Sequence, residues 1–253
     1  MIDSWTVAAI IAAAGFAAGV INAVVGSGTL VTFSALLAVG IPPVTANGTN
    51  TTGLFPGAFT AAYVYRNELR SRLRQLRLPL LATVMGAGLG AALVVRLPEE
   101  VFGSVVPWLI ALATVMVAVQ PIRTKLASRN PRSPEGTRRR ALWPWTGAVG
   151  IYGGYFGAAQ GVVLMAVLTW LYDERPQYSN AAKNLLAATA NTVAAIVFIS
   201  VGAISWPAAG ILAISSVLGG YWGGRWARRL PETVLRGMVI AVGIIATTTL
   251  VIN

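Results

Sequence analysis

The chain has 253 residues, of which 56% are hydrophobic and only 11% are charged, with a mean hydropathy of +0.69. Soluble domains carry about 25% charged residues, so a water-soluble globular fold is excluded. The net charge of +11 suggests nucleic acid as a partner, but no basic fold motif interleaved with aromatic residues accompanies it, and we exclude nucleic acid. The chain has no Cys and no His, which excludes disulfides and thiolate metal sites.

The apolar residues form ten helical segments, several of which approach the roughly 20 residues that cross a bilayer. The segments of the first half are 5–25, 29–40, 46–65, 78–96 and 103–122. Those of the second half are 143–158, 161–172, 179–201, 207–224 and 232–251. The acidic residues lie near the ends of these segments or between them. The sequence therefore predicts an all-α integral membrane protein.

Most of the basic residues lie in connections between the apolar segments. Three connections, 66–77, 123–142 and 225–231, hold 15 of the 19 Lys and Arg residues. This distribution is the positive-inside pattern, so we expect all three to be cytoplasmic and to face anionic lipid headgroups. The longest of them, 123–142, also contains Pro and Gly and is the predicted boundary between a first transmembrane repeat, 1–122, and a second, 143–253.

The two halves resemble each other. Gly86–Gly90 followed by Arg96-Leu-Pro-Glu99 recurs 133 positions later as Gly219–Gly223 followed by Arg229-Leu-Pro-Glu232. Equivalent loops have opposite character, because 66–77 is rich in Arg whereas its counterpart, 202–206, has no charge. Each half has five segments, an odd number, which predicts two inverted-topology repeats of about five helical segments each. The alternative is two parallel repeats whose loop charges have diverged.

A glycine-rich interruption occurs near the start of each half, and we name Asn22–Thr29 the first break and Gly153–Gly161 the second break. The candidate binding residues are Asn22, Gly26, Ser27 and Gly28 in the first break and Gly157, Gln160 and Gly161 in the second. Non-helical backbone at membrane depth is tolerated only where protein or a water-filled cavity satisfies it. A helix that restarts after a break directs free N–H groups and a positive dipole end at its surroundings, which suits an anion. We therefore expect the first two segments of each half to form a glycine-broken helical hairpin around an anion site. Alternatively, these glycines only allow close helix packing, as we expect for Gly86, Gly90, Gly219 and Gly223.

The third segment of each half carries a second polar cluster. Its candidate substrate contacts are Thr49 and Asn50 in the first half and Lys183 and Asn184 in the second. Lys183 is the one basic residue placed some way into an apolar segment. It either contacts the substrate, snorkels to the cytoplasmic surface, or pairs with Asp173 or Glu174.

Several of these motifs together resemble one family. The first break, the turn Gly40–Pro43 and the motif Ala46-Asn-Gly-Thr-Asn50, with Tyr155–Ala158 and Ala182-Lys-Asn184 in the second half, resemble the sulfite exporter TauE/SafE family of membrane transporters. The resemblance covers nearly the whole chain. It implies transport of sulfite, sulfoacetate or a related organosulfonate across a prokaryotic cytoplasmic membrane, with the two breaks lining the path and Asn50, Lys183 and Asn184 contacting the anion. Thr29 and Ala159-Gln160 stand where the family is richer in Gly, which leaves the identity of the anion open.

The expected function is alternating-access transport of a small anion at a site between the two breaks. The apolar segments hold no acid–base pair to activate a nucleophile, so we expect no enzyme, no metal and no cofactor. The alternatives are a membrane-embedded enzyme, a carrier of a different anion, or a scaffold, in which the breaks would lie in dry, close-packed contacts. The sequence leaves open the direction, the coupling ion, the oligomeric state, and whether the first two segments of each half span the membrane or are re-entrant.

Overall fold

The computed structural model describes residues 4–70, 72–128, 135–172, 176–226 and 232–252. Within these ranges every regular element is helical and there is no strand. The elements of the first half are α1 Ser4–Val24, α2 Gly28–Ala38, α3 Pro43–Val64, α4 Arg66–Arg70, η1 Leu73–Leu76, α5 Arg77–Arg96 and α6 Glu99–Ser128. Those of the second half are α7 Glu135–Tyr155, α8 Gln160–Leu171, α9 Pro176–Ser200, α10 Trp206–Trp226 and α11 Glu232–Ile252.

The helices confirm the predicted all-α membrane class. Four stretches of the described residues are long and apolar enough to cross a membrane: Ser4–Val24, Leu73–Arg96, Glu99–Val119 and Gln177–Ser200. By contrast, α2 has 11 residues and α8 has 12. At 1.5 Å per residue, each is about 17 Å long, roughly half the thickness of the hydrocarbon core. Both helices that follow a break are therefore too short to span the bilayer alone.

Some helices extend beyond the apolar segments. The basic connection 66–77 contains α4 and η1, and both α6 and α7 continue into the predicted linker 123–142. Arg and Lys have helix propensities close to that of Ala, so a helix continues through them after it leaves the apolar region. Residues 129–134 of the linker and 227–231 of the third basic connection lie outside the described residues. The division of the chain at this linker stays a prediction.

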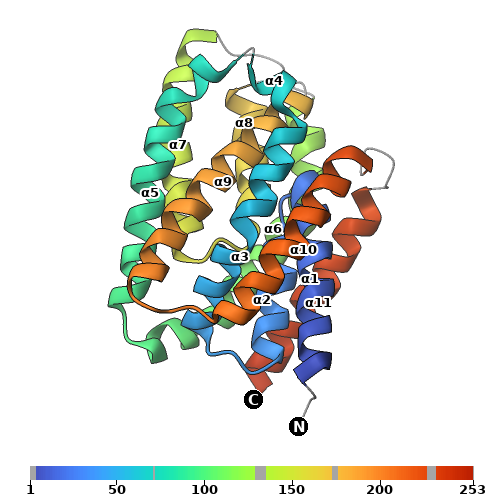
Figure 1. The fold of residues 1–253 in the computed structure, drawn as a ribbon. Helices are drawn as coiled ribbons and strands as arrows, with labels where there is room; N and C mark the ends of the chain where they lie inside the picture. Colours follow the sequence, from blue (N-terminus) through green and yellow to red (C-terminus); the bar gives the residue numbers. More distant parts are fainter. Residues whose placement is uncertain (1–3, 71, 129–134, 173–175, 227–231, 253) are drawn as a thin grey trace.

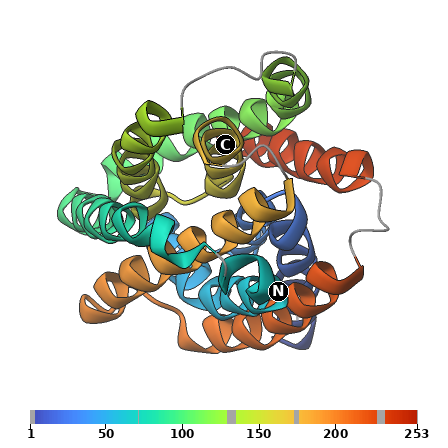
Figure 2. The ribbon, with the colours of Figure 1, turned by 90° about the horizontal axis from the view of Figure 1, so that it is seen from above.

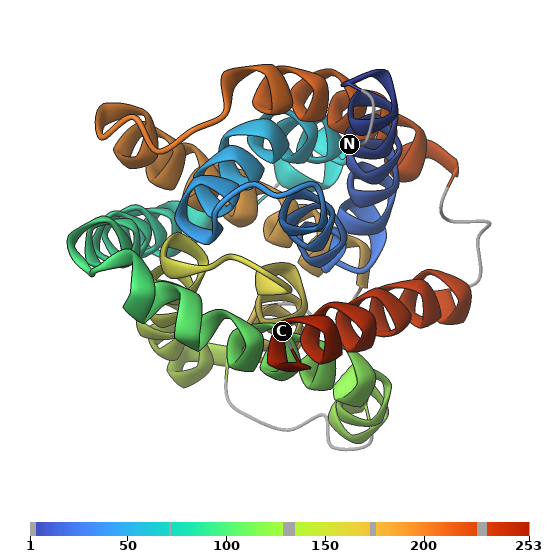
Figure 3. The ribbon, with the colours of Figure 1, turned by 90° about the horizontal axis from the view of Figure 1, so that it is seen from below.

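Each of the most extensive helix pairs joins a helix of the first half to a helix of the second. The chief pairs are α1 with α10, α5 with α7, α3 with α10, α5 with α9, α3 with α9, and α6 with α11. If α1 corresponds to α7 and α5 to α10, exchanging the two halves converts the α1–α10 pair into the α5–α7 pair. The same exchange leaves the α3–α9 and α6–α11 pairs unchanged. The end views show this arrangement around the α3–α9 pair (Figures 2 and 3). In Figure 1, α1 runs upward from the N-terminus whereas α7 runs downward.

Small residues allow the backbones in these pairs to approach closely. A Cβ added to Gly219 of α10 would lie less than 3.0 Å from the Phe16 carbonyl of α1, and one added to Gly90 of α5 would lie equally close to the Ile151 carbonyl of α7. Gly86 and Gly223 have the same kind of neighbour. The predicted packing role of these four glycines is confirmed, and it is the small-residue contact typical of membrane helices.

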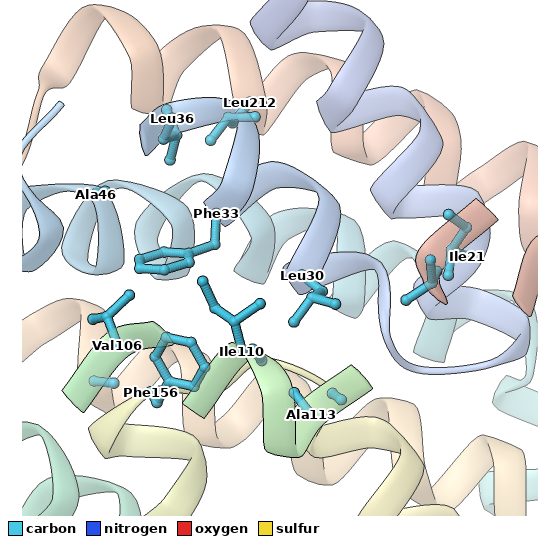
Figure 4. Packing of buried hydrophobic residues seen from close by; sticks show 14 of the residues in the cluster. Ile21, Leu30, Phe33, Leu36, Ala46, Val106, Ile110, Ala113, Phe156 and Leu212 are labelled. Carbon is cyan, nitrogen blue, oxygen red and sulfur yellow. The ribbon is translucent and has the colours of Figure 1, made fainter. Parts of the chain in front are cut away.

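Aromatic and aliphatic side chains fill the space between α2, α6 and the end of α7 (Figure 4). Phe33 of α2 meets Phe156 edge to face, with ring centroids 5.0 Å apart. Phe156 follows α7 directly, so this apolar cluster holds the second break against α2. The outer surface is also apolar, with Met85, Ile214 and Ile245 each at least 65% exposed, as a surface in contact with lipid requires.

The α1–α10 contact predicts the effect of one substitution. Gly219→Val places a branched side chain against unyielding α1 backbone, and we expect a loss of stability of about 1–3 kcal/mol or more. Thermal denaturation of the purified protein in detergent measures it. The matched control is Gly210→Ala on the same helix, where an added Cβ meets nothing within 4 Å and stability should be unchanged. Equal effects of the two substitutions would contradict the packing role.

Candidate functional site

The two breaks contact each other at glycine. Gly26 has φ of +88°, a conformation that residues with a Cβ rarely adopt. A Cβ added to Gly26 would lie 2.7 Å from the Gly161 Cα, and one added to Gly161 would lie 2.5 Å from the Gly26 Cα. Gly28 is equally confined, because its Cβ would meet the Ala18 backbone of α1. Glycine at 26 and 161 therefore permits the contact between the breaks, and glycine at 28 permits the packing of α2 against α1.

Thr29 joins the first break to the second. Its hydroxyl donates to the Gly157 carbonyl over 3.2 Å and accepts the Ala159 N–H over 3.1 Å. Gly157 and Ala159 have φ of +73° and +56°, so both lie in the left-handed region, and Ala159 is the N-cap of α8. A side chain of the first half therefore forms hydrogen bonds with the irregular backbone of the second break.

The helices that precede the breaks end in the same way. The Ile21 carbonyl of α1 accepts the N–H groups of Val25 and Gly26, and the Tyr152 carbonyl of α7 accepts those of Phe156 and Gly157. The first break has one addition, because the Asn22 side chain accepts the Gly28 N–H over 2.8 Å. Asn22 thus links the last turn of α1 to the first turn of α2.

Two residues of α9 bind the carbonyl end of α1. Asn180 Nδ2 donates to the Ala23 carbonyl over 2.9 Å, and Lys183 Nζ donates to the Asn22 and Val24 carbonyls over 2.9 and 3.5 Å. A cation at this place also interacts favourably with the negative end of the helix dipole. Lys183 is only 1% exposed, so it does not snorkel to the surface. The alternative pairing with Asp173 or Glu174 lies outside the described residues.

α3 contributes the corresponding contacts on the other side. Asn47 Nδ2 donates to the Tyr155 carbonyl, the last of α7, over 2.9 Å. Asn50 accepts the Thr32 hydroxyl at Oδ1 and donates through Nδ2 to the Thr29 carbonyl. Asn50 therefore fixes α2, and through Thr29 the second break, to α3.

Two of the candidate residues have other surroundings. The Thr49 hydroxyl accepts the Ser205 N–H over 2.9 Å, at the connection between α9 and α10 and away from the breaks. Asn184 lies on α9 one turn beyond Asn180, and its buried Nδ2 has no hydrogen-bond partner. The structure thus brings the candidate residues of the two breaks together with Asn50 and Lys183, and places Thr49 elsewhere.

Buried polar atoms without a hydrogen-bond partner gather in the two breaks and on the facing helices. Of the nine such atoms among the described residues, five lie here: Ser27 Oγ, Gln160 Nε2, Asn47 Oδ1, Asn180 Oδ1 and Asn184 Nδ2. The other four belong to Ser34, Thr52, Gln75 and Thr83. Each such atom costs about 1–3 kcal/mol and calls for a water or a ligand. Ser27 and Gln160 stand at the N-cap and first residue of α2 and α8, where N–H groups favour negative charge. The described residues contain no cluster of three or more His, Cys, Asp or Glu that would hold a metal.

Sequence reasoning did not select three residues that organise this region: Thr29, Asn47 and Asn180. A usable signal was present for the two asparagines, because they are 133 positions apart, the same separation as the glycine repeats. Thr29 had no such signal. Its role depends on contact with the second half, which only the folded chain reveals.

Thr29→Val tests the link between the breaks. The substitution keeps the shape of the side chain but leaves the buried Ala159 N–H unsatisfied, so we expect a loss of about 1–3 kcal/mol in unfolding free energy. Denaturation in detergent provides the measurement. Thr29→Ser is the control, because it retains the hydroxyl and removes one methyl, worth about 1 kcal/mol. A Val variant as stable as the Ser variant would show that the hydroxyl does not hold the breaks together.

Comparison with known proteins agrees with the membrane architecture. The sulfite exporter TauE/SafE family matches residues 11–250. A probable membrane transporter protein of Haemophilus influenzae is 28% identical, over 96% of this chain and 94% of its own length. The probable membrane transporter protein ORF9 of Sinorhizobium is 28% identical over 91% of this chain and 87% of its own length, and YfcA of Escherichia coli K12 is 27% identical over 89% and 82%. No solved structure gives a significant match.

Proposed function

The chain belongs to the sulfite exporter TauE/SafE family, and we propose that it carries a small sulfur-containing anion across the membrane, such as sulfite, sulfoacetate or a related organosulfonate. The observation that carries this proposal is the pair of buried donors without partners, Ser27 Oγ and Gln160 Nε2, at the starts of α2 and α8. An anion bound there accepts hydrogen bonds from these groups and faces two helix N-termini. The buried ammonium of Lys183 adds positive charge nearby.

Alternating access at this site requires the two breaks to separate. The direct contact of Gly26 with Gly161 is the close packing that a scaffold would also have. Unsatisfied buried hydroxyls also occur away from the breaks, as at Ser34, so only their placement disfavours a scaffold: one donor lies at the start of each helix that follows a break, where N–H groups favour an anion. We therefore read the present conformation as closed, with the anion entering when the breaks move apart. This mechanism involves transport without covalent chemistry, so the protein is not an enzyme.

Inverted-topology repeats supply the motion in this proposal. Exchanging the two halves converts the α1–α10 pair into the α5–α7 pair, and α1 and α7 run in opposite directions (Figure 1). A pseudo-twofold relation of this kind gives two conformations of similar energy, each open to one side. The location that follows is a prokaryotic cytoplasmic membrane, with the basic connections 66–77, 123–142 and 225–231 on the cytoplasmic side near anionic lipids.

Cysteine labelling tests this orientation, because the natural chain has no Cys to remove. Arg70→Cys, on α4, should react with a membrane-impermeant maleimide only in inside-out vesicles. Val201 lies directly before the equivalent connection of the second half, 202–206, and is 53% exposed, so Val201→Cys should react only from the outer side of intact cells. Labelling of both positions from the same side would contradict the inverted repeats.

Flux measurements test the proposed anion site. Proteoliposomes containing the protein should accumulate radiolabelled sulfite or an organosulfonate, and Ser27→Ala should lower the transport efficiency about tenfold through loss of a hydrogen bond to a charged group. The matched control is Ser34→Ala, which removes another buried hydroxyl without a partner from α2, two turns from the break. Ser34→Ala should leave transport unchanged. Flux of a cation without flux of any sulfur anion would contradict the proposal, and equal effects of the two variants would remove Ser27 from the site.

A further inference from the structure

The two helix ends at the breaks are closely matched. Each of α1 and α7 ends with a carbonyl that accepts two successive N–H groups, and each end is held by an asparagine of the opposite half. Asn180 binds the Ala23 carbonyl of α1, and Asn47, 133 positions earlier, binds the Tyr155 carbonyl of α7. In both asparagines the amide nitrogen is used and the buried amide oxygen has no partner.

The two ends differ in charge. At the end of α1, Lys183 lies three residues beyond Asn180 on the same helix face and places its ammonium on two carbonyl oxygens. The position three residues beyond Asn47 is Asn50, which is neutral and is bonded to Thr32 and Thr29 of α2. One helix end thus has a built-in cation, and its counterpart has a neutral residue directed elsewhere.

The end of α7 has the groups that a small cation prefers. Asn47 is fully buried, and its Oδ1 must lie near the Tyr155 carbonyl because its Nδ2 donates to that oxygen. The last carbonyls of a helix carry about half a negative charge in total, which is poorly screened in a buried site. Neutral amide and carbonyl oxygens at the C-terminal end of a broken helix are the ligands that coordinate Na⁺ in transporters of inverted-repeat design.

We propose that the end of α7 binds one small monovalent cation, with Asn47 Oδ1 and α7 carbonyl oxygens as ligands. The cation does at the second break what the Lys183 ammonium does at the first. A single charge fits because the counterpart is an ammonium, and the described residues offer no cluster of carboxylates for a divalent ion. If the proposed anion transport is correct, this cation is the coupling ion: it binds next to the anion and offsets the anion's charge.

Cation binding is measured on the purified protein in detergent without any anion substrate. A ligand that binds only the folded state raises the thermal midpoint in a saturable manner. We expect Na⁺ or K⁺ chloride to raise the midpoint relative to choline chloride at equal ionic strength, because choline is too large for the site. Asn47→Ala should raise the half-saturating cation concentration about tenfold or more, as expected when one contact to a charge is lost.

Two further variants separate cation binding from general damage. Asn180→Ala removes the matching asparagine at the end of α1 and should lower stability without shifting the half-saturating concentration. Asn50→Lys supplies an ammonium at the position equivalent to Lys183 and should abolish the dependence on added cation. If Asn47→Ala does not fold, binding of radioactive Na⁺ to the unaltered protein, competed by unlabelled Na⁺ or K⁺ but not by choline, decides the question.

The outcomes distinguish this inference from the proposed function. Identical midpoints in Na⁺, K⁺ and choline, with no radioactive Na⁺ bound, would mean that water satisfies Asn47 Oδ1 and would overturn the cation site, even if anion flux is present. An equal shift of the half-saturating concentration in the Asn47 and Asn180 variants would also overturn it. Saturable cation binding without flux of any sulfur anion would retain the site and refute the transport proposal.

Discussion

Backbone carbonyl and N–H groups inside a membrane have no water to bind, and this constraint governs how the protein is built around its two broken helices. An unbroken helix satisfies its own backbone, but α1 and α7 stop inside the bundle and leave carbonyls without partners in the chain that follows. The structure supplies those partners from the other half. Lys183 and Asn180 bind the end of α1, and Asn47 binds the end of α7.

Glycine has two separate roles in this chain. On α5 and α10 it removes side-chain volume so that regular helices pack backbone to backbone, as at Gly90 and Gly219. At Gly26 and Gly157 it instead permits a positive φ, which ends one helix and starts the next within a few residues. Substitution affects the two groups differently. In the first it separates two helices, and in the second it alters the backbone that the candidate site is made of.

The sequence predicted the helices and the position of the breaks because these depend on local composition. Apolar segment length predicted α1 and α5 closely, and the glycine clusters located the starts of α2 and α8. The partners of individual side chains were not predictable in this way. Lys183, a candidate substrate contact by sequence, binds carbonyls more than 150 residues away in the chain, and its sequence neighbours do not indicate these partners. Thr49 belongs to a polar cluster in the sequence, but its side chain on α3 points to the α9–α10 connection.

The hydrogen bonds between the two halves have a consequence for biosynthesis. The ribosome completes α1 long before α9 is made, so the carbonyls of Asn22 and Ala23 have no Asn180 or Lys183 to bind while the first half enters the membrane. The hydroxyl of Thr29 likewise lacks Gly157 and Ala159. The first hairpin therefore reaches its final geometry only after the second half has been inserted.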